Sequence, residues 1–333
     1  MSILFHGART LSLGRVCAGL MAASWFTGAA MAASYPDRPI QVVVPYGAGS
    51  ADIVPRMATA AISERTGHHF IVDNRPGAGG LIGTQYVLRQ PADGYNVLVA
   101  ATNNILINQL VYESHKIEPL EELTPVAKLV TVPLIVGVNA DLPIHSLAEM
   151  VEYGRQGNGF DFSSPSVGTP PHIAAESLLH TLGLKGMHIP YKGGVAMATA
   201  VGSGEVQLAV VAYATLQSMI ASDRVRPLAV VSAERLAVLP DVPTVAEAGY
   251  PQLMEAIPPN WWSFTVKAGT PEPIVADLAK WTKEAMADPA LQESYRKLGM
   301  VPSFEDAETL RAGLAKEAEQ WKELVTRLGI RAE

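Results

Sequence analysis

Short apolar runs rich in β-branched residues recur along the chain, and each is followed by a turn and a longer amphipathic stretch. Residues 40–44, 70–73 and 96–101 are the first three such runs. Runs of this length and composition are typical of strands buried in a parallel sheet. Because they alternate with helical stretches throughout, the pattern predicts an α/β fold.

Two other apolar runs suit segments that pass from one lobe to another. Residues 126–138 form an unusually long β-branched run, and residues 261–266 form a second candidate for such a crossing. The pattern therefore predicts two lobes, with residues 33–125 and 262–333 in the first and residues 126–261 in the second.

Two small-residue loops stand between a predicted strand and a predicted helix. The first is Y-G-A-G-S-A-D at residues 46–52, and the second is S-P-S-V-G-T-P-P-H at residues 164–172. The first N–H groups of a helix have no partner within it, and the helix dipole adds positive potential there. Since one loop falls in each predicted lobe, the sequence predicts a small anion held between the lobes.

The first 32 residues have the pattern of an export signal. Two arginines precede the apolar residues 16–30, and Ala30-Met31-Ala32 fits the small-residue cleavage pattern. A membrane span would need about 20 apolar residues. We therefore predict a cleavable signal peptide over residues 1–32 and a periplasmic mature protein. Its loss would remove Cys17, the single cysteine, so no disulfide or cysteine metal site is expected.

Composition narrows the possible functions. The chain has 32 acidic and 25 basic residues, a formal net charge of −7, without a basic cluster, so no nucleic-acid partner is expected. Its 48% hydrophobic content is that of a folded chain. The eight histidines lack metal-ligand spacing, so no metal site is expected. From Pro271 on, the pattern predicts amphipathic helices interrupted at Pro289 and Pro302.

Eight segments in order along the chain carry a family resemblance. They are Y-P-D-R-P-I (residues 35–40), V-V-P-Y-G-A-G-S-A-D (43–52), N-R-P-G-A-G-G (74–80), P-A-D-G-Y (91–95), S-P-S-V-G-T-P-P-H (164–172), P-Y-K-G (190–193), L-P-D-V-P-T-V-A-E-A-G (239–249) and A-G-T-P (268–271). Together they resemble the substrate-binding proteins of tripartite tricarboxylate transporters, also called the Bordetella uptake (Bug) family. The segments span nearly all of the predicted mature chain.

The resemblance implies a type II periplasmic binding-protein fold, with two α/β lobes joined by two crossing strands and a ligand cleft between them. It also implies a monomer without catalysis or cofactor, a small carboxylate ligand, and the permease subunits of a membrane transporter as partners. In the family, the two loops hold a ligand carboxylate through backbone groups and bridging waters. The candidate ligand-binding residues are Tyr46, Gly47, Ala48, Gly49, Ser50, Ala51, Asp52, Asn103, Ser166, Val167, Gly168, Thr169, His172, Tyr213 and Trp262.

The sequence departs from the family pattern in two places. The first loop, at residues 47–51, is one residue shorter than usual and lacks adjacent glycines. Members that bind amino acids tend to place an acid near the region that here reads A-V-V-A-Y-A, residues 209–214. Since that region has no charge, we expect an organic acid without an amino group, either a dicarboxylate or an aromatic carboxylate.

Several candidate residues have a structural alternative. Asp52 suits a helix cap as well as a binding loop, and His172 suits a histidine with internal partners at a helix start. Of Trp261 and Trp262, one is expected in the core and the other in the cleft. Tyr213 follows a strand end, where it would line the cleft or cover the core.

Two functions other than solute transport fit parts of the sequence. Gly47-Ala48-Gly49 after a strand resembles the start of a dinucleotide-binding loop, and Asp73 lies about where a ribose-binding acid would stand. However, Asp52 occupies the third-glycine position, where its charge would oppose a pyrophosphate. The other alternative is a receptor that presents its ligand to a membrane sensor, and the sequence is compatible with both transport and sensing.

Overall fold

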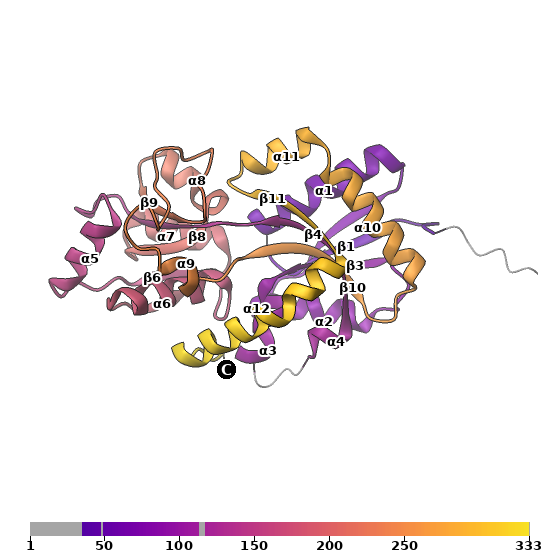
Figure 1. Ribbon diagram of the computed structural model, residues 1–333, viewed down its shortest axis with the longest axis horizontal. Coiled ribbons are helices and arrows are strands. Elements are labelled where there is room, and N and C mark those ends of the chain that lie inside the picture. The colour runs from indigo at the N-terminus through magenta and orange to yellow at the C-terminus, as the bar shows by residue number, and fades with distance from the viewer. Residues whose placement is uncertain (1–34, 48, 113–116, 333) are drawn as a thin grey trace, which may run out of the picture. The chain divides into compact units, whose positions relative to one another are not determined.

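The computed structural model describes residues 35–47, 49–112 and 117–332 (Figure 1). The predicted signal peptide over residues 1–32 lies outside this part of the chain, as does the candidate Ala48. The chain divides into Met1–Asp37 and the compact unit Arg38–Glu333, and the latter is described below. No helix among the described residues has the length and apolar character needed to cross a membrane.

A six-stranded sheet in the order β11-β4-β10-β3-β1-β2 forms the centre of the first lobe. The central strands β1 and β3 pair in parallel, and β10 runs antiparallel to both β3 and β4. The strands are β1 (Ile40–Val44), β2 (Phe70–Asn74), β3 (Asn96–Ala101), β4 (Leu123–Thr131), β10 (Trp261–Lys267) and β11 (Val301–Asp306).

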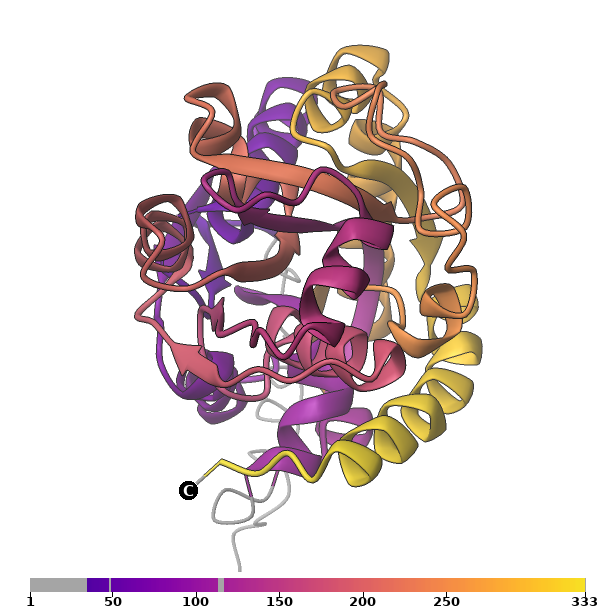
Figure 2. The ribbon, with the colours of Figure 1, turned by 90° about the vertical axis from the view of Figure 1, so that its left-hand side faces the viewer.

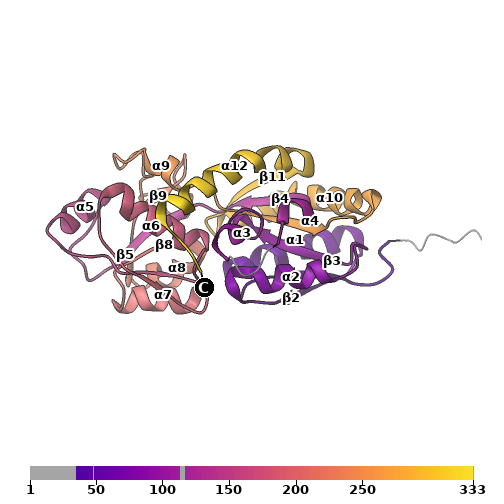
Figure 3. The same ribbon diagram turned by 90° about the horizontal axis from the view of Figure 1, so that it is seen from below.

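Helices from both ends of the chain surround this sheet. In Figure 3 they lie around the first sheet, and α12 also reaches α6 (Pro170–Leu182) of the second lobe. They are α1 (Ser50–Thr66), η1 (Ala78–Gly80), α2 (Leu81–Arg89), η2 (Asn103–Ile107), α3 (Asn108–Val111), α4 (Pro119–Glu122), α10 (Glu272–Met286), α11 (Pro289–Arg296) and α12 (Ala307–Leu328).

The second lobe has a five-stranded sheet in the order β7-β6-β8-β5-β9 and faces the viewer in Figure 2. Its strands are β5 (Leu134–Asn139), β6 (Phe162–Ser164), β7 (His188–Pro190), β8 (Leu208–Ala212) and β9 (Val225–Val231). Its helices are α5 (Leu147–Arg155), α6 (Pro170–Leu182), α7 (Gly194–Ser203), α8 (Tyr213–Ala221) and α9 (Leu253–Ala256).

The chain crosses between the two sheets twice. The apolar run at residues 126–138 is divided between β4 of the first sheet and β5 of the second, with Val132 and Pro133 between them. The chain returns after β9 and enters β10 at Trp261. The division predicted between residues 125 and 126 therefore falls inside β4. Two α/β lobes joined by two crossings confirm the predicted architecture.

One strand contradicts the prediction for the C-terminal part of the chain. Residues around Pro302 were expected only to interrupt helices, but residues 301–306 form β11 at the edge of the first sheet. Its residues are half-buried or exposed, so it lacks the apolar pattern that identifies a strand. Proline is tolerated there because an edge strand leaves one row of N–H groups unpaired.

Candidate functional site

In the first lobe, four chain segments meet at one edge of the sheet. The strands β1, β2 and β3 are parallel, so the loops that follow them leave from the same edge. Strand β10 is antiparallel to β3, and Trp262 at its start pairs with Ala101 at the end of β3. This topology brings the first binding loop beside the glycine-rich segment of residues 74–80, Asn103 and the entrance to β10.

The second lobe has a corresponding edge. Its strands β6, β7 and β8 are parallel, and the N–H of Tyr191 after β7 donates to Ser164 O at the end of β6, at 2.9 Å. The second binding loop therefore lies between the start of α7 and the start of α8. The first residue of β5, Leu134, pairs with Ala212 at the end of β8, which places the first crossing at this edge as well.

A cavity of about 730 Å³ is lined by residues from both edges. Eight of the candidate ligand-binding residues line it, namely Tyr46, Gly47, Gly49, Ala51, Asn103, Ser166, Thr169 and Trp262. Five described candidates do not, namely Asp52, Val167, Gly168, His172 and Tyr213. Ser50 begins α1, and Ala48 lies outside the described residues. We refer to this cavity as the cleft.

Tyr46 fixes the first loop against two neighbouring segments. Its hydroxyl lies 2.7 Å from Asn103 Oδ1 and 2.6 Å from Asn104 Oδ1. Its ring packs edge-to-face on the ring of Trp262, with 5.3 Å between the ring centroids. Burial raises the pKa of Tyr46 above its ordinary value, so the phenol remains protonated. Since Asn103 Nδ2 donates to Gly79 O at 2.6 Å, the same network includes the glycine-rich segment.

The start of α1 also explains why Asp52 does not line the cleft. Gly49 precedes the helix with φ 148°, a conformation that favours glycine, and its carbonyl accepts from the N–H groups of Asp52 and Ile53. The Asp52 carboxylate accepts from Arg56 Nε at 2.9 Å. Burial opposes ionisation of Asp52, but hydrogen bonds from Arg56 and Asn74 outweigh it and hold the pKa of Asp52 below its usual range. Asp52 therefore stabilises the first turn of α1.

The second loop is held in shape by its own side chains. The carbonyl of Ser166 accepts hydrogen bonds from Thr169 Oγ1 at 2.8 Å and from Ser164 Oγ at 2.9 Å. The N–H of Gly168 donates to Nδ1 of His172 at 3.1 Å, and His172 is only 5% exposed. Thr169 therefore uses its hydroxyl proton within the loop, and His172 supports the loop from beneath instead of facing the cleft.

A second histidine stacks on His172. The two rings lie 3.7 Å apart between centroids, and His188 Nε2 is 2.6 Å from Ser164 Oγ. The ring of Phe162 stacks on His188 at 5.1 Å. Burial and, secondarily, the neighbouring His172 lower the pKa of His188 to about 3. His188 is thus neutral near pH 7 and forms part of the support of the second loop.

This arrangement predicts a loss of stability in mild acid. An unfolded histidine has a pKa near 6.5, so the unfolded state binds more protons than the folded state between pH 6.5 and about 3. The contribution of His188 is therefore fully present above pH 6.5 and decreases as the pH falls towards 3. In His188→Gln, the decrease in unfolding free energy between pH 7.5 and 4.5 should be smaller by about 1–2 kcal/mol. Urea unfolding at both pH values measures this, and equal decreases in the two proteins would contradict it.

Four parts of the cleft lining were not among the sequence candidates. They are the glycine-rich segment after β2, the segment from Tyr191 into α7, the first turns of α8 beyond Tyr213, and Asn260 before β10. The motifs N-R-P-G-A-G-G and P-Y-K-G were signals for the first two, because both follow predicted strands. Nothing in the sequence singled out Asn260.

The electrostatic character of the cleft is positive. Of the described residues that line it, Lys192 alone has a charged side chain, and no ion pair or hydrogen bond of that side chain is found within the described residues. The first turns of α6, α7 and α8 contain no acidic residue. Their N-termini therefore add uncompensated positive potential to that of Lys192. The arrangement suits an anion.

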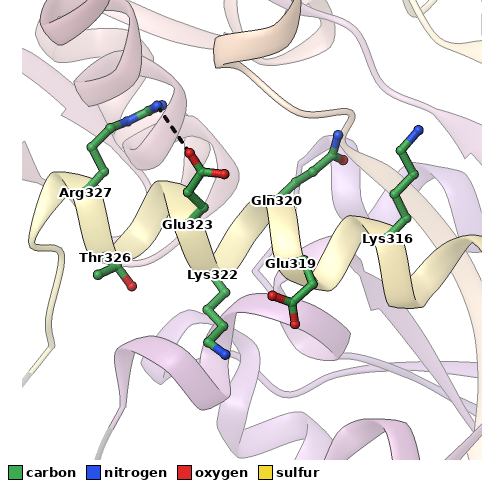
Figure 4. A pocket seen from close by; sticks show the side chains of 7 residues that line it. All are labelled: Lys316, Glu319, Gln320, Lys322, Glu323, Thr326 and Arg327. Carbon is green, nitrogen blue, oxygen red and sulfur yellow. Dashed lines mark ion pairs between the residues drawn. The ribbon is translucent and has the colours of Figure 1, made fainter.

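A separate hollow lies along α12 and is shown in Figure 4. All seven residues that line it, from Lys316 to Arg327, belong to this one helix and are exposed. Glu323 and Arg327 form an ion pair at 4.0 Å within it. Since no second element of the described chain lines this surface, it does not enclose a small molecule as the cleft does. Elsewhere in the described residues, no three histidine or acidic side chains gather as metal ligands.

Comparison with known proteins gives consistent matches. A family model described as "Tripartite tricarboxylate transporter family receptor" matches residues 54–330. Protein BugT of Bordetella pertussis is 30% identical over 302 residues, which cover 90% of this chain and 91% of BugT. An R. palustris protein solved with adipate superimposes with a TM-score of 0.84 and 28% identity over 89% of this chain and 99% of that protein. The periplasmic binding protein BugD superimposes with a TM-score of 0.82 and 30% identity, over 90% of this chain and 100% of BugD.

Proposed function

Because the chain belongs to the tripartite tricarboxylate transporter receptor family, whose members are periplasmic solute-binding receptors and not enzymes, we propose that its cleft captures a small organic carboxylate for delivery to a membrane transporter. The predicted two-lobed periplasmic binding-protein fold is confirmed by the same matches. The proposal includes removal of residues 1–32 as a signal peptide and release into the periplasm.

One observation carries the proposal: the N-termini of α1, α6, α7 and α8 meet the same cleft, together with Lys192. A carboxylate there would accept hydrogen bonds from N–H groups at the start of α1 in the first lobe and of α7 and α8 in the second, and pair with a lysine. The helix α6 adds its dipole only, because its first two residues are prolines without N–H groups. A charge-assisted hydrogen bond contributes roughly 1.5–3 kcal/mol. A micromolar complex needs about 8 kcal/mol beyond the cost of association. Several such hydrogen bonds together supply a free energy of this order.

The volume and lining of the cleft indicate the size and polarity of the ligand. Its volume of about 730 Å³ lies in the ordinary range of about 300–1,000 Å³ for small-molecule sites. Apolar side chains from Leu134, Met197, Val211 and Met219 line it, and the described lining has no aspartate or glutamate. A ligand ammonium would therefore have no anionic partner, whereas a short carbon chain or a ring would be well accommodated. The adipate complex of the R. palustris protein supports a dicarboxylate.

A thermal-shift screen tests this function. The mature protein is heated with carboxylic acids, with their amides and with the corresponding amino acids. A ligand at 100 times its dissociation constant stabilises a protein by about 2.7 kcal/mol, which for a chain of this size raises the Tm by about 3–6 °C. We expect such shifts with one or more acids and none with the amides. Shifts with amides or amino acids alone would exclude carboxylate capture.

Delivery to a transporter is tested separately from binding. A cell that lacks this chain should lose uptake of the labelled ligand at concentrations near the dissociation constant. If the receptor instead served a membrane sensor, uptake would be unchanged and only the transcriptional response to the ligand would be lost. The two outcomes separate transport from sensing without affecting the assignment of the ligand.

A further inference from the structure

Asn260, directly before β10, and Trp261 and Trp262, the first two residues of β10, have different environments. Side chains alternate along an extended strand, so Asn260 and Trp262 lie on one face and Trp261 on the other. Trp261 is fully buried in the core, and its Nε1–H donates to Glu317 at 2.8 Å. Asn260 and Trp262 line the cleft instead, and they are 8% and 7% exposed.

The cleft-facing pair lacks hydrogen-bond partners where Trp261 has one. Trp262 Nε1 and Asn260 Oδ1 are both fully buried, and neither has a partner among the described residues. Such atoms are uncommon in folded proteins, because each loses its bond to water on burial. Both residues line the cleft, Asn260 directly before β10 and Trp262 within it. The two unpartnered atoms therefore indicate that a polar group of the ligand binds beside them.

We propose that Asn260 and Trp262 bind a hydroxyl group on the carbon chain of the ligand, so that the solute is a hydroxy acid. The hydroxyl accepts a hydrogen bond from Trp262 Nε1–H and donates one to Asn260 Oδ1. This inference rests on the proposed function, since the carboxylate of the same molecule is held at the helix N-termini. The hydroxyl contact is a second polar contact beside that of the carboxylate, and it favours hydroxy acids over carboxylic acids that lack the hydroxyl.

Hydrogen-bonding capacity favours a hydroxyl over the other common groups. An indole N–H only donates, and an amide oxygen only accepts. A carboxylate only accepts, so it would leave Asn260 Oδ1 without a partner, and an ammonium only donates, so it would leave Trp262 Nε1 without one. A hydroxyl does both with a single oxygen. A site that bonds a ligand hydroxyl discriminates strongly against the analogue that lacks it, because the buried groups of the protein are then left unpaired.

Calorimetric titration with matched acid pairs tests the inference. The pairs are malate with succinate, 2-hydroxyglutarate with glutarate, and mandelate with phenylacetate, and each differs by one hydroxyl. In the pair that binds the wild-type protein most tightly, the hydroxy acid should bind at least tenfold more tightly. Asn260→Leu and Trp262→Phe should each weaken the hydroxy acid about tenfold or more and change the other acid less than threefold.

The neighbouring tryptophan provides the matched control. Trp261→Phe removes an indole N–H that is bonded to Glu317 and faces away from the cleft, so the preference for the hydroxy acid should remain. If an acid pair binds but shows no preference, or if the variants weaken both acids equally, the hydroxyl contact is wrong while the proposed function stands. If none of the six acids binds at millimolar concentration, the hydroxy-acid assignment is wrong, and if only non-acids give shifts in the thermal-shift screen, the proposed function fails as well.

Discussion

Replacing Gly83 with alanine is expected to lower the free energy of unfolding by about 3 kcal/mol. Gly83 lies in α2, where a Cβ atom would stand 2.7 Å from Pro45 Cβ, 2.8 Å from Pro45 Cα and 3.0 Å from Arg75 O. Two of these atoms belong to the backbone, so the added methyl group cannot be accommodated by a side-chain rotation. The helix or the end of β1 would have to move. Urea unfolding at pH 7.5 measures the change.

A second helical glycine gives the control. Gly313 in α12 is exposed, and a Cβ atom added there would meet no atom within 4 Å. Gly313→Ala should therefore stabilise the protein by about 0.5–1 kcal/mol, the difference in helix propensity between glycine and alanine. Similar effects of the two substitutions would show that α2 does not pack as closely on Pro45 as the structure indicates.

Lys192→Met is expected to weaken carboxylate binding ten- to a hundredfold. The substitution keeps most of the aliphatic chain and removes the only charge among the described residues that line the cleft. A charge-assisted hydrogen bond to a carboxylate contributes roughly 1.5–3 kcal/mol, which corresponds to that loss of affinity. Binding to the variant should also depend less on ionic strength. Isothermal titration with the best acid from the thermal-shift screen, at two salt concentrations, measures both effects.

Lys185 is the control for this charge. It lies in the second lobe before β7 and is exposed, but it does not line the cleft. Lys185→Met changes the net charge by the same amount and should alter affinity less than twofold. If both substitutions weakened binding equally, Lys192 would act through general attraction and not through contact with the ligand.

The sequence pattern predicted the structural features that are formed by residues adjacent in the sequence. The two strand–loop–helix units are visible because their glycines, serines and apolar runs are contiguous. The division of the tryptophans follows from strand alternation, but the pattern could not say which of them faces the core. The edge strand β11 was missed because its residues, half-buried or exposed, lack the apolar run that marks a strand.

The remaining parts of the site depend on topology, which the pattern does not contain. Lys192 reaches the cleft because β7 pairs in parallel with β6, so the loops after both strands leave from one edge. Asn260 reaches it because β10 runs antiparallel to β3 and begins where β3 ends. Tyr213, for which the sequence left both the cleft and a cover of the core open, does not line the cleft and packs on Gly299, whose added Cβ atom would lie 2.7 Å from Tyr213 Cβ. These outcomes follow from contacts between distant segments.

Isothermal titration of an acid against its own amide tests the central claim most directly. The best acid from the screen, its monoamide or diamide, and its amino-acid counterpart are titrated into the mature protein under identical conditions. Since the described lining of the cleft presents helix N-termini and Lys192, the acid should bind at least tenfold more tightly than the amide and the amino acid. Tighter binding of the amide, or a clear preference for aspartate or glutamate, would contradict the account.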